Sequence, residues 1–296
     1  MAKEICKFRG GLRKGVCTAV FLLACSLVWE ARADLTLSTM SFNIRNGRAK
    51  DGENAWEKRK EFTADVIRDY KADVVGLQEA FREQMDFLVE ALPEFAEIGE
   101  GRDGGEEGEY SAILYRKDRF KVIDSGTFWL SDTPEKPSIT WGNACVRVCT
   151  WARFQDGESG RTFYLYNTHL DHKSQPSREK SVRLIADRIA DRKHPDPVIL
   201  MGDFNAGEDN PVVTFLTNPE AKPLRMVDSF RVLHPDEAVV GTGNRFTGRR
   251  DGAKIDYVFV EPGTKVTEAT IIRTSREGRY PSDHFPVGAR LRLGGN

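Results

Sequence analysis

The segment VILMGDFNAG, residues 198–207, constrains the fold more than any other part of the chain. Its four consecutive apolar residues predict a strand that is buried on both faces. The run then ends abruptly in Asp203 and Asn205, with Phe204 between them. Residues two apart on a strand point to the same face. We therefore expect both polar side chains to face one cleft while Phe204 packs into the core behind them.

The rest of the chain mixes strand-like and helix-like segments in both halves. Residues 35–43 alternate apolar and polar positions as a strand does, and the stretch from 110 to 170 is rich in such segments. Three further strand-like runs lie at 254–262, 265–273 and 285–293. Apolar residues at helical spacing predict helices within 56–70, 82–92 and 177–193. This mixture favours an α/β fold with sheets in the middle and helices outside.

The first 33 residues differ from the rest and predict an export signal, Met1–Ala33. A basic start precedes an apolar run of 14 residues, and Ala31 and Ala33 provide the small residues that a signal peptidase accepts. A retained membrane anchor is the alternative, but a spanning helix needs about 20 apolar residues. Lipid attachment at Cys25 is a third interpretation. No repeat or linker divides the remainder, so we expect one domain over 34–296.

Loss of the signal would remove six basic and two acidic residues and leave a formal net charge of −5. A mildly acidic protein is not a general binder of polyanions, although a local basic patch could still hold phosphate. We therefore expect an exported, periplasmic or secreted protein, monomeric and without an obligate protein partner.

Polar residues that bind metals or carry protons recur at the ends of predicted elements. Each one alone has an ordinary explanation, since Asn and Asp are favoured in turns and caps. Six segments in succession favour a shared site instead. The residues are Asn43, Glu79, His169, Asp203, Asn205, Asp256, Asp283 and His284.

The motifs around these residues, in their order and approximate spacing, resemble the endonuclease/exonuclease/phosphatase superfamily. The resemblance spans Leu37 to Leu293, and its most specific part is GDFN together with the downstream SDH. It implies a four-layered α/β sandwich: two mixed β-sheets packed face to face, helices outside, and an active site at one edge. The motifs are SFNIR, GLQEA, THL, GDFN, IDYVF and SDH.

Phosphoester hydrolysis requires a positioned water, neutralised charge on the phosphoryl oxygens and a proton for the leaving oxygen. Asn43 and Glu79 offer hard oxygen ligands, which suit Mg²⁺ or Mn²⁺ better than Zn²⁺. The resemblance implies that these two residues, often with Asp283, hold the catalytic cation.

The remaining motif residues suit proton transfer and charge stabilisation. The resemblance assigns Asp203 the role of general base or water-orienting group, and the amide of Asn205 can donate to a phosphoryl oxygen. We expect His284 to pair with Asp256, which would fix its tautomer and raise its pKa. His169 would supply a second imidazole.

Three further residues are candidates for substrate binding or support. Glu109 is expected to be the carboxylate partner of His169. His172 would either reach the substrate or only cap a loop. Arg147 alternates with apolar neighbours in CVRVCTW, and an inward-facing arginine is costly unless a carboxylate or a substrate phosphate pairs with it.

These residues predict an exported, divalent-metal-dependent phosphoesterase, with small phosphoesters or sugar phosphates as the first choice of substrate. An extracellular nuclease would need a basic surface that follows the phosphates. A sphingomyelinase-like enzyme would need exposed apolar hairpins for membrane contact. A binding module that has lost catalysis is the hypothesis from another class, and the intact set of motif residues argues against it.

Overall fold

The computed structural model describes residues 34–294. The export signal expected in Met1–Ala33, with the possible lipid site at Cys25, lies outside the described residues. Within 34–294, no helix combines the length and the apolar character needed to cross a membrane.

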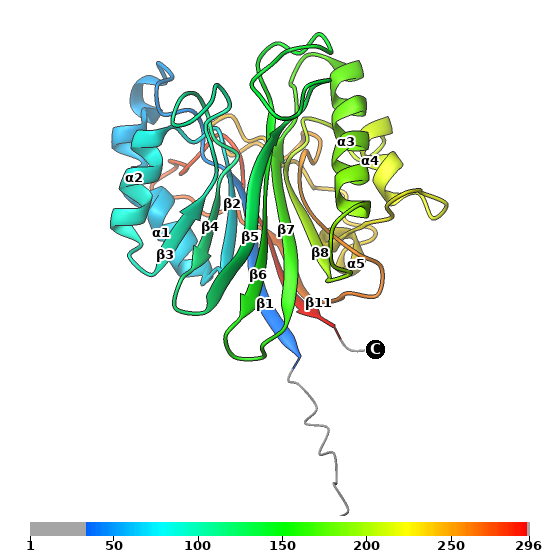
Figure 1. Ribbon diagram of the computed structural model, residues 1–296. Coiled ribbons are helices and arrows are strands. Elements are labelled where there is room, and N and C mark those ends of the chain that lie inside the picture. Colours follow the sequence, from blue (N-terminus) through cyan, green and yellow to red (C-terminus); the bar gives the residue numbers. More distant parts are fainter. Residues whose placement is uncertain (1–33, 295–296) are drawn as a thin grey trace, which may run out of the picture. The chain divides into compact units, whose positions relative to one another are not determined.

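Two mixed six-stranded sheets make up the centre of the described part (Figure 1). The first has the order β11-β12-β1-β2-β4-β3, in which only β1 and β2 are parallel. Its strands are β1 (Leu35–Asn43), β2 (Val74–Gln78), β3 (Phe95–Ile98), β4 (Ile113–Arg116), β11 (Lys265–Ile271) and β12 (Val287–Leu293).

The second sheet has the order β5-β6-β7-β8-β10-β9, and its one parallel pair is β7 with β8. Its strands are β5 (Phe120–Trp129), β6 (Val148–Asp156), β7 (Thr162–His169), β8 (Val198–Asp203), β9 (Val227–Asp228) and β10 (Asp256–Val260).

Helices cover the outer face of each sheet, and three hydrophobic clusters fill the interfaces between the layers (Figure 1). The first sheet carries α1 (Lys60–Tyr70) and α2 (Arg82–Ala91), preceded by the short 3-10 helices η1 (Gly52–Asn54) and η2 (Trp56–Lys58). The second carries α3 (Gln175–Ala190), α4 (Pro211–Thr217) and α5 (Ser229–Leu233). The predicted four-layered α/β sandwich is confirmed.

The alternation of side chains along β1 decides which face its last residue presents. Leu35 and Leu37 belong to the cluster between the sheets, whereas Met40 and Phe42 belong to the cluster under α1 and α2. Asn43 has the same parity as Leu35 and Leu37, so it faces the space between the sheets. The end of β1 therefore delivers a polar side chain to the rim of the inter-sheet core.

A buried amide joins the two sheets beneath this rim. Asn167 of β7 donates through Nδ2 to the carbonyls of Leu77 (2.8 Å) and Ala112 (2.7 Å), and its Oδ1 accepts from Gln78 Nε2 (2.7 Å). A Cβ at Gly76 would lie 2.6 Å from Asn167 Oδ1, so only glycine permits this approach. This connection could not be predicted from the sequence, because Asn167 lies inside a strand-like run.

Candidate active site

Six strands bring the predicted site residues to one edge of the sandwich, the upper edge in Figure 1. β1, β2, β7 and β8 end where the antiparallel strands β10 and β12 begin, and a hydrogen bond from Asn43 to Asp203 joins the two sheets there. The residues gathered at this edge are Asn43, Glu79, His169, Asp203, Asn205, Asp256, Asp283 and His284.

Asp203 lies at the centre of this group and is 1% exposed. Its Oδ2 accepts a hydrogen bond from Asn43 Nδ2 (3.1 Å) and its Oδ1 accepts from the backbone N–H of Asn205 (2.8 Å). Asp256 stands directly opposite on β10. Burial, with the charge of Asp256, raises the pKa of Asp203 to about 7. The carboxyl can therefore exchange a proton near neutral pH, as a general base must.

Glu79 follows β2 directly and has a left-handed backbone with φ of 61°, which is strained for a residue other than glycine. Asn43 Nδ2 donates to its Oε1 (3.1 Å), and the backbone N–H of Asn46 donates to its Oε2 (2.9 Å). Burial opposes ionisation, but these hydrogen bonds and the charges of His284 and Arg45 lower the pKa of Glu79 below its usual value. The site therefore contains an ionised carboxylate at this position.

The predicted pair of His284 and Asp256 is present. His284 donates through Nδ1 to Asp256 Oδ2 at 2.9 Å, and the same nitrogen lies 3.9 Å from Asp203 Oδ2. Burial opposes the charged imidazole, but Asp256, Asp203 and Asp283 together raise the pKa of His284 well above its usual value. His284 is therefore an imidazolium at neutral pH. Among residues 34–294, the buried Oδ1 of Asp256 has no hydrogen-bond partner.

The second imidazole has a different environment. Asn205 donates through Nδ2 to His169 Nε2 (3.0 Å) and to the carbonyl of Leu170 (3.0 Å). Burial and the nearby charge of Arg147 lower the pKa of His169 well below its usual value. His169 is therefore neutral, with Nε2 as an acceptor. Both N–H groups of the Asn205 amide are engaged, so donation to a phosphoryl oxygen requires one of these bonds to be released.

The position of Asn205 in the site does not follow from the alternation of side chains along a strand. β8 ends at Asp203, and Asn205 has a left-handed backbone with φ of 48°. The turn lets its N–H cap Asp203 while its side chain reaches His169. Phe204 packs under the helices of the second sheet, as expected. The expected convergence is present, but a turn and not the strand produces it.

The expected partnership of Glu109 with His169 is wrong in this structure. Glu109 Oε1 accepts from Asn46 Nδ2 (2.9 Å), and its Oε2 pairs with Arg102 Nη1 (2.5 Å). Glu109 and His169 line the same small hollow, but the hydrogen bonds of Glu109 go to Asn46 and Arg102. Burial raises the pKa of Glu109. A carboxylate is drawn to the stronger cationic donor, and the 99–109 loop supplies Arg102 from close by.

Arg147 lies just before β6 and is buried, and its Nη2 donates to His172 Nδ1 (3.1 Å). The Nε of Arg147 lies 3.8 Å from Asp171 and makes no hydrogen bond within the described part of the chain. His172 is exposed. Protein partners thus account for part of the burial cost of Arg147, and a role for either residue in substrate binding stays a prediction.

The donor set at one side of the site fits a hard divalent cation. Glu79 and Asp283 are carboxylates with side chains 16% and 21% exposed, so both are reachable from solvent. Nη1 of Arg45 lies 3.9 Å from Glu79 Oε2 and 3.9 Å from Asp283 Oδ2. The space between these carboxylates therefore already favours positive charge. Burial raises the pKa of Asp283, and the nearby negative charge of Glu79 adds to this effect.

Sequence reasoning missed the residues that hold this side of the site in place. Arg59 is buried and donates to four backbone carbonyls, including those of Ile44 (2.5 Å), Arg45 (2.9 Å) and Pro281 (2.9 Å). It thereby connects the loop after Asn43 to the loop before Asp283. Burial lowers the pKa of Arg59 to about 10. Only the proximity of Arg45 and Asn46 to Asn43 in FNIRNG could have drawn attention to this loop.

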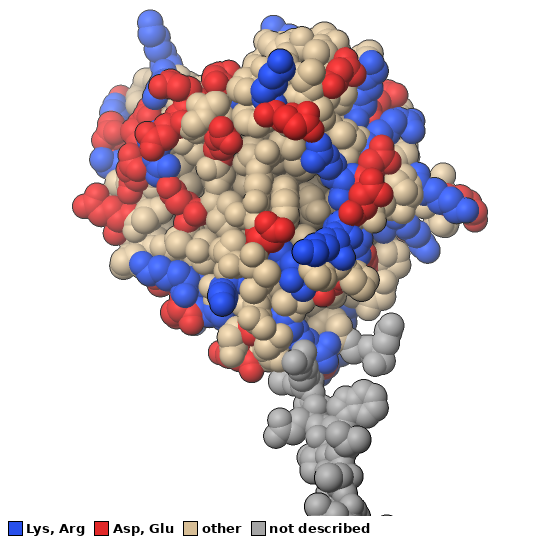
Figure 2. All heavy atoms as spheres, viewed as in Figure 1, with Lys and Arg blue, Asp and Glu red and all other residues tan. Residues whose placement is uncertain are grey.

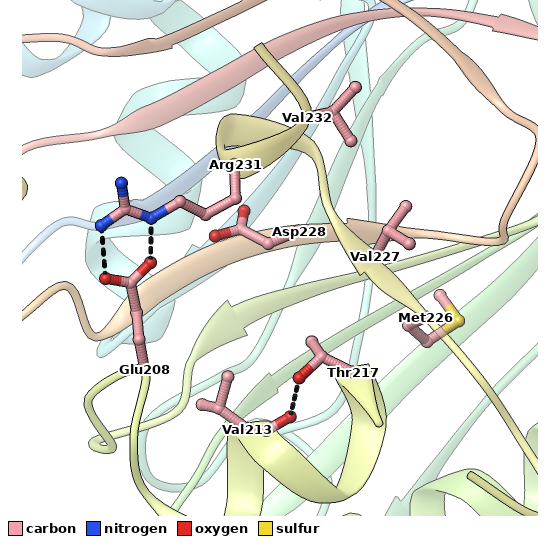
Figure 3. Close-up of a pocket in the computed structure, with 8 residues that line it drawn as sticks. All are labelled: Glu208, Val213, Thr217, Met226, Val227, Asp228, Arg231 and Val232. Carbon is pink, nitrogen blue, oxygen red and sulfur yellow. Dashed lines mark hydrogen bonds and ion pairs between the residues drawn. The ribbon is translucent and has the colours of Figure 1, made fainter. Parts of the chain in front are cut away.

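A separate hollow of about 380 Å³ lies between α4, β9 and α5. Glu208 accepts two hydrogen bonds from Arg231 at 2.6 and 2.8 Å along one side of it, and Val227 and Val232 line another part (Figure 3). None of the residues that line it belongs to the polar group at the strand ends. The hollow is therefore separate from the candidate active site.

Comparison with known proteins agrees with the geometry. Residues 40–284 match the model of the Endonuclease/Exonuclease/phosphatase family, and this range contains every residue of the polar group at the strand ends. A curated relative from Acanthamoeba polyphaga mimivirus, named Uncharacterized protein L388, is 25% identical over 213 residues, 69% of this chain and 79% of that protein.

Solved structures are similar over almost the whole described part. An endonuclease/exonuclease/phosphatase family protein from Bacteroides thetaiotaomicron has a TM-score of 0.82 and 31% identity, covering 89% of this chain and 100% of that one. A mannosyl-6-phosphatase from the same organism has a TM-score of 0.79 and 33% identity, covering 86% and 99%. TDP2 from D. rerio, complexed with single-stranded DNA, is 20% identical with a TM-score of 0.68 over 87% and 99%, which shows the shared fold alone. This chain belongs to the endonuclease/exonuclease/phosphatase family of phosphoester hydrolases.

Proposed function

We propose that the protein is an exported, monomeric phosphatase that requires Mg²⁺ or Mn²⁺ and hydrolyses small phosphorylated molecules, with sugar phosphates as the first candidates. The observation that carries the proposal is the arrangement around Asp203. A carboxyl with a pKa near 7 lies 3.9 Å from a charged imidazole, and an amide connects it to an ionised carboxylate.

The chain's own residues supply proton transfer and orientation. Asp203 takes a proton from the attacking water, and the hydrogen bonds from Asn43 and the Asn205 backbone keep its oxygens aimed into the site. A Mg²⁺ or Mn²⁺ held by Glu79 and Asp283, with Asn43, would polarise a phosphoryl oxygen.

His284 supplies positive charge where negative charge develops on the phosphoryl group. Its Nδ1 is committed to Asp256, so Nε2 is the N–H that can face the substrate or donate a proton to the leaving oxygen. His169, held neutral, offers an acceptor to a substrate or water hydroxyl in place of the Asn205 amide. The two imidazoles thus supply opposite functions within one site.

Two observations support a small phosphorylated substrate over a nucleic acid. The mannosyl-6-phosphatase is 33% identical over 86% of this chain. Charge is the other: the chain without residues 1–33 has a formal net charge of −5, and the face shown in Figure 2 carries acidic side chains among its basic ones. A surface that follows a polyanion would need a continuous basic track.

The test is turnover by the purified chain from Asp34 onward, stripped with EDTA and supplied with Mg²⁺, Mn²⁺ or Ca²⁺. The substrates are sugar phosphates, phosphodiesters, plasmid and single-stranded DNA, RNA, and sphingomyelin. We expect cation-dependent hydrolysis of sugar phosphates. The rate should fall by about 10³-fold in Asp203→Asn, because this variant loses the general base that also positions the water. Asp209→Asn, an exposed acid in the following loop, should leave the rate unchanged. Preference for DNA or sphingomyelin, or no turnover by folded protein, would contradict the proposal.

A further inference from the structure

Arg45 lies beside Glu79 and Asp283, the two carboxylates that fit a divalent metal ion. Its Nη1 lies 3.9 Å from an oxygen of Glu79 and 3.9 Å from an oxygen of Asp283. Neither distance is a hydrogen bond. The arginine therefore contributes charge to this space without being committed to either carboxylate.

The guanidinium is held there by a third carboxylate. Asp51 accepts from Arg45 Nε at 2.9 Å and from Nη2 at 3.0 Å, a two-point contact that fixes the plane of the guanidinium. The backbone is fixed as well. Arg45 has a left-handed φ of 59°, its N–H donates to Asn43 Oδ1 (3.0 Å), and its carbonyl accepts from Arg59 Nη2 (2.9 Å).

This anchoring leaves one nitrogen available. Within the described residues, Nε and Nη2 of Arg45 are hydrogen-bonded to Asp51 while Nη1 donates no hydrogen bond. The Arg45 side chain is 31% exposed, and the carboxylates of Glu79 and Asp283 are also partly exposed. The free N–H groups of Nη1 and the candidate cation ligands are therefore close together, on side chains that are all partly open to solvent.

A fixed positive charge at this distance repels a metal ion that binds between Glu79 and Asp283. The repulsion becomes attraction when an anion lies between the two cations, because a phosphoryl group can accept from Nη1 with one oxygen while another oxygen meets the metal. An arginine that only neutralised the carboxylates would contact them directly, as Arg102 contacts Glu109 at 2.5 Å.

We propose that Arg45 couples cation binding to phosphate binding: it weakens the divalent metal site while the site holds no anion, and it donates from Nη1 to a non-bridging phosphoryl oxygen when substrate binds. The inference rests on the proposed function, because it assumes a metal at Glu79 and Asp283. It adds a residue that contacts the substrate. It also makes the binding of cation and phosphate cooperative, since binding of either ligand raises the affinity for the other by the same factor.

The test measures Mn²⁺ binding to the purified protein by EPR or calorimetry, with and without excess inorganic phosphate, and needs no turnover. In the wild type we expect phosphate to tighten Mn²⁺ binding about tenfold. Arg45→Gln should bind Mn²⁺ about fivefold more tightly without phosphate, and phosphate should then change its affinity less than about twofold. Unchanged Mn²⁺ affinity with a wild-type response to phosphate would overturn the proposal, as would loss of Mn²⁺ binding by folded Arg45→Gln.

Two further variants keep the test decisive. Arg48→Gln removes a nearby exposed arginine that pairs with Glu83 instead, and it should behave as the wild type does. Asp51→Asn keeps the positive charge but removes its anchor, so it should lose most of the phosphate response even if Arg45→Gln fails to fold. A wild-type protein that binds no Mn²⁺ would instead contradict the metal-dependent function itself, so the two failures are distinguishable.

Discussion

The two imidazoles of the site differ in charge although they lie around the same aspartate. His284 donates to Asp256 at 2.9 Å, and its pKa is raised well above the usual value. His169 accepts from the Asn205 amide at 3.0 Å, and its pKa is lowered well below that value. Both contact Asp203 Oδ2, at 3.9 and 3.5 Å.

Burial acts in the same direction on both rings, so the difference in charge between them comes from their partners. Burial disfavours the imidazolium in both cases. Three carboxylates overcome burial at His284, whereas Arg147 adds to its effect at His169. One site thus holds a fixed cation and a fixed acceptor at the same pH, which suits charge stabilisation by one ring and hydrogen-bond acceptance by the other.

Removing the charged ring should have the largest effect. His284→Ala leaves Asp203 and Asp256 facing each other without the intervening cation, so the pKa of Asp203 should rise further and its base form should be scarcer at neutral pH. We expect kcat/KM to fall by about 10³-fold, a transition-state loss of the size seen when one stabilising donor is removed. Steady-state kinetics on the preferred substrate at pH 7 measures this. A loss below tenfold would contradict the assigned role.

Removing only the carboxylate should have a smaller effect and a distinct pH signature. Asp256→Asn keeps a hydrogen-bond acceptor but removes the charge that raises the pKa of His284. Because the imidazolium is the active form, the alkaline limb of the rate profile should move to lower pH, with a loss of about 10²-fold at pH 8. The acid limb should also move to lower pH, because Asp256 raises the pKa of Asp203. Unmoved limbs in a folded variant would show that Asp256 has only a structural role.

Glu109→Gln should have the smallest effect. Glu109 is bound by Asn46 and Arg102 and not by His169, so the neutral ring should keep its partner and its proton state. We expect kcat to change less than about threefold and the pH profile to keep its shape, as for a paired carboxylate at the margin of a site. A large loss with a shifted pH profile would restore the partnership that the sequence suggested.

Much of this arrangement could be predicted from the sequence, because the signals are local. The alternation in 35–43 predicted β1 over the residues that the structure gives, and the polar residues at strand ends do converge. Polar residues at the carboxyl ends of neighbouring parallel strands lie at the same edge of a sheet, so their positions follow from the strand ends. The pairing of His284 with Asp256 followed from the motifs alone.

The rest depended on contacts that no local pattern encodes. Both His169 and Arg102 are possible partners for Glu109, and the conformation of the 99–109 loop places Arg102 against it. Arg45 lies in a loop whose left-handed backbone directs its side chain toward Asp51 and the site. Loop conformation depends on long-range hydrogen bonds, here those of Arg59 to carbonyls far apart in the sequence.

The opposite charge states of the two imidazoles are tested most directly by ¹⁵N NMR of the histidine rings in EDTA-treated protein at pH 7.5. Spectra of His284→Ala and His169→Gln assign the signals among the five histidines. We expect both nitrogens of His284 to be protonated and one nitrogen of His169 to be unprotonated, and neither ring to titrate between pH 6.5 and 7.5. Two neutral rings, or two rings that titrate together near the ordinary pKa of about 6.5, would contradict this expectation.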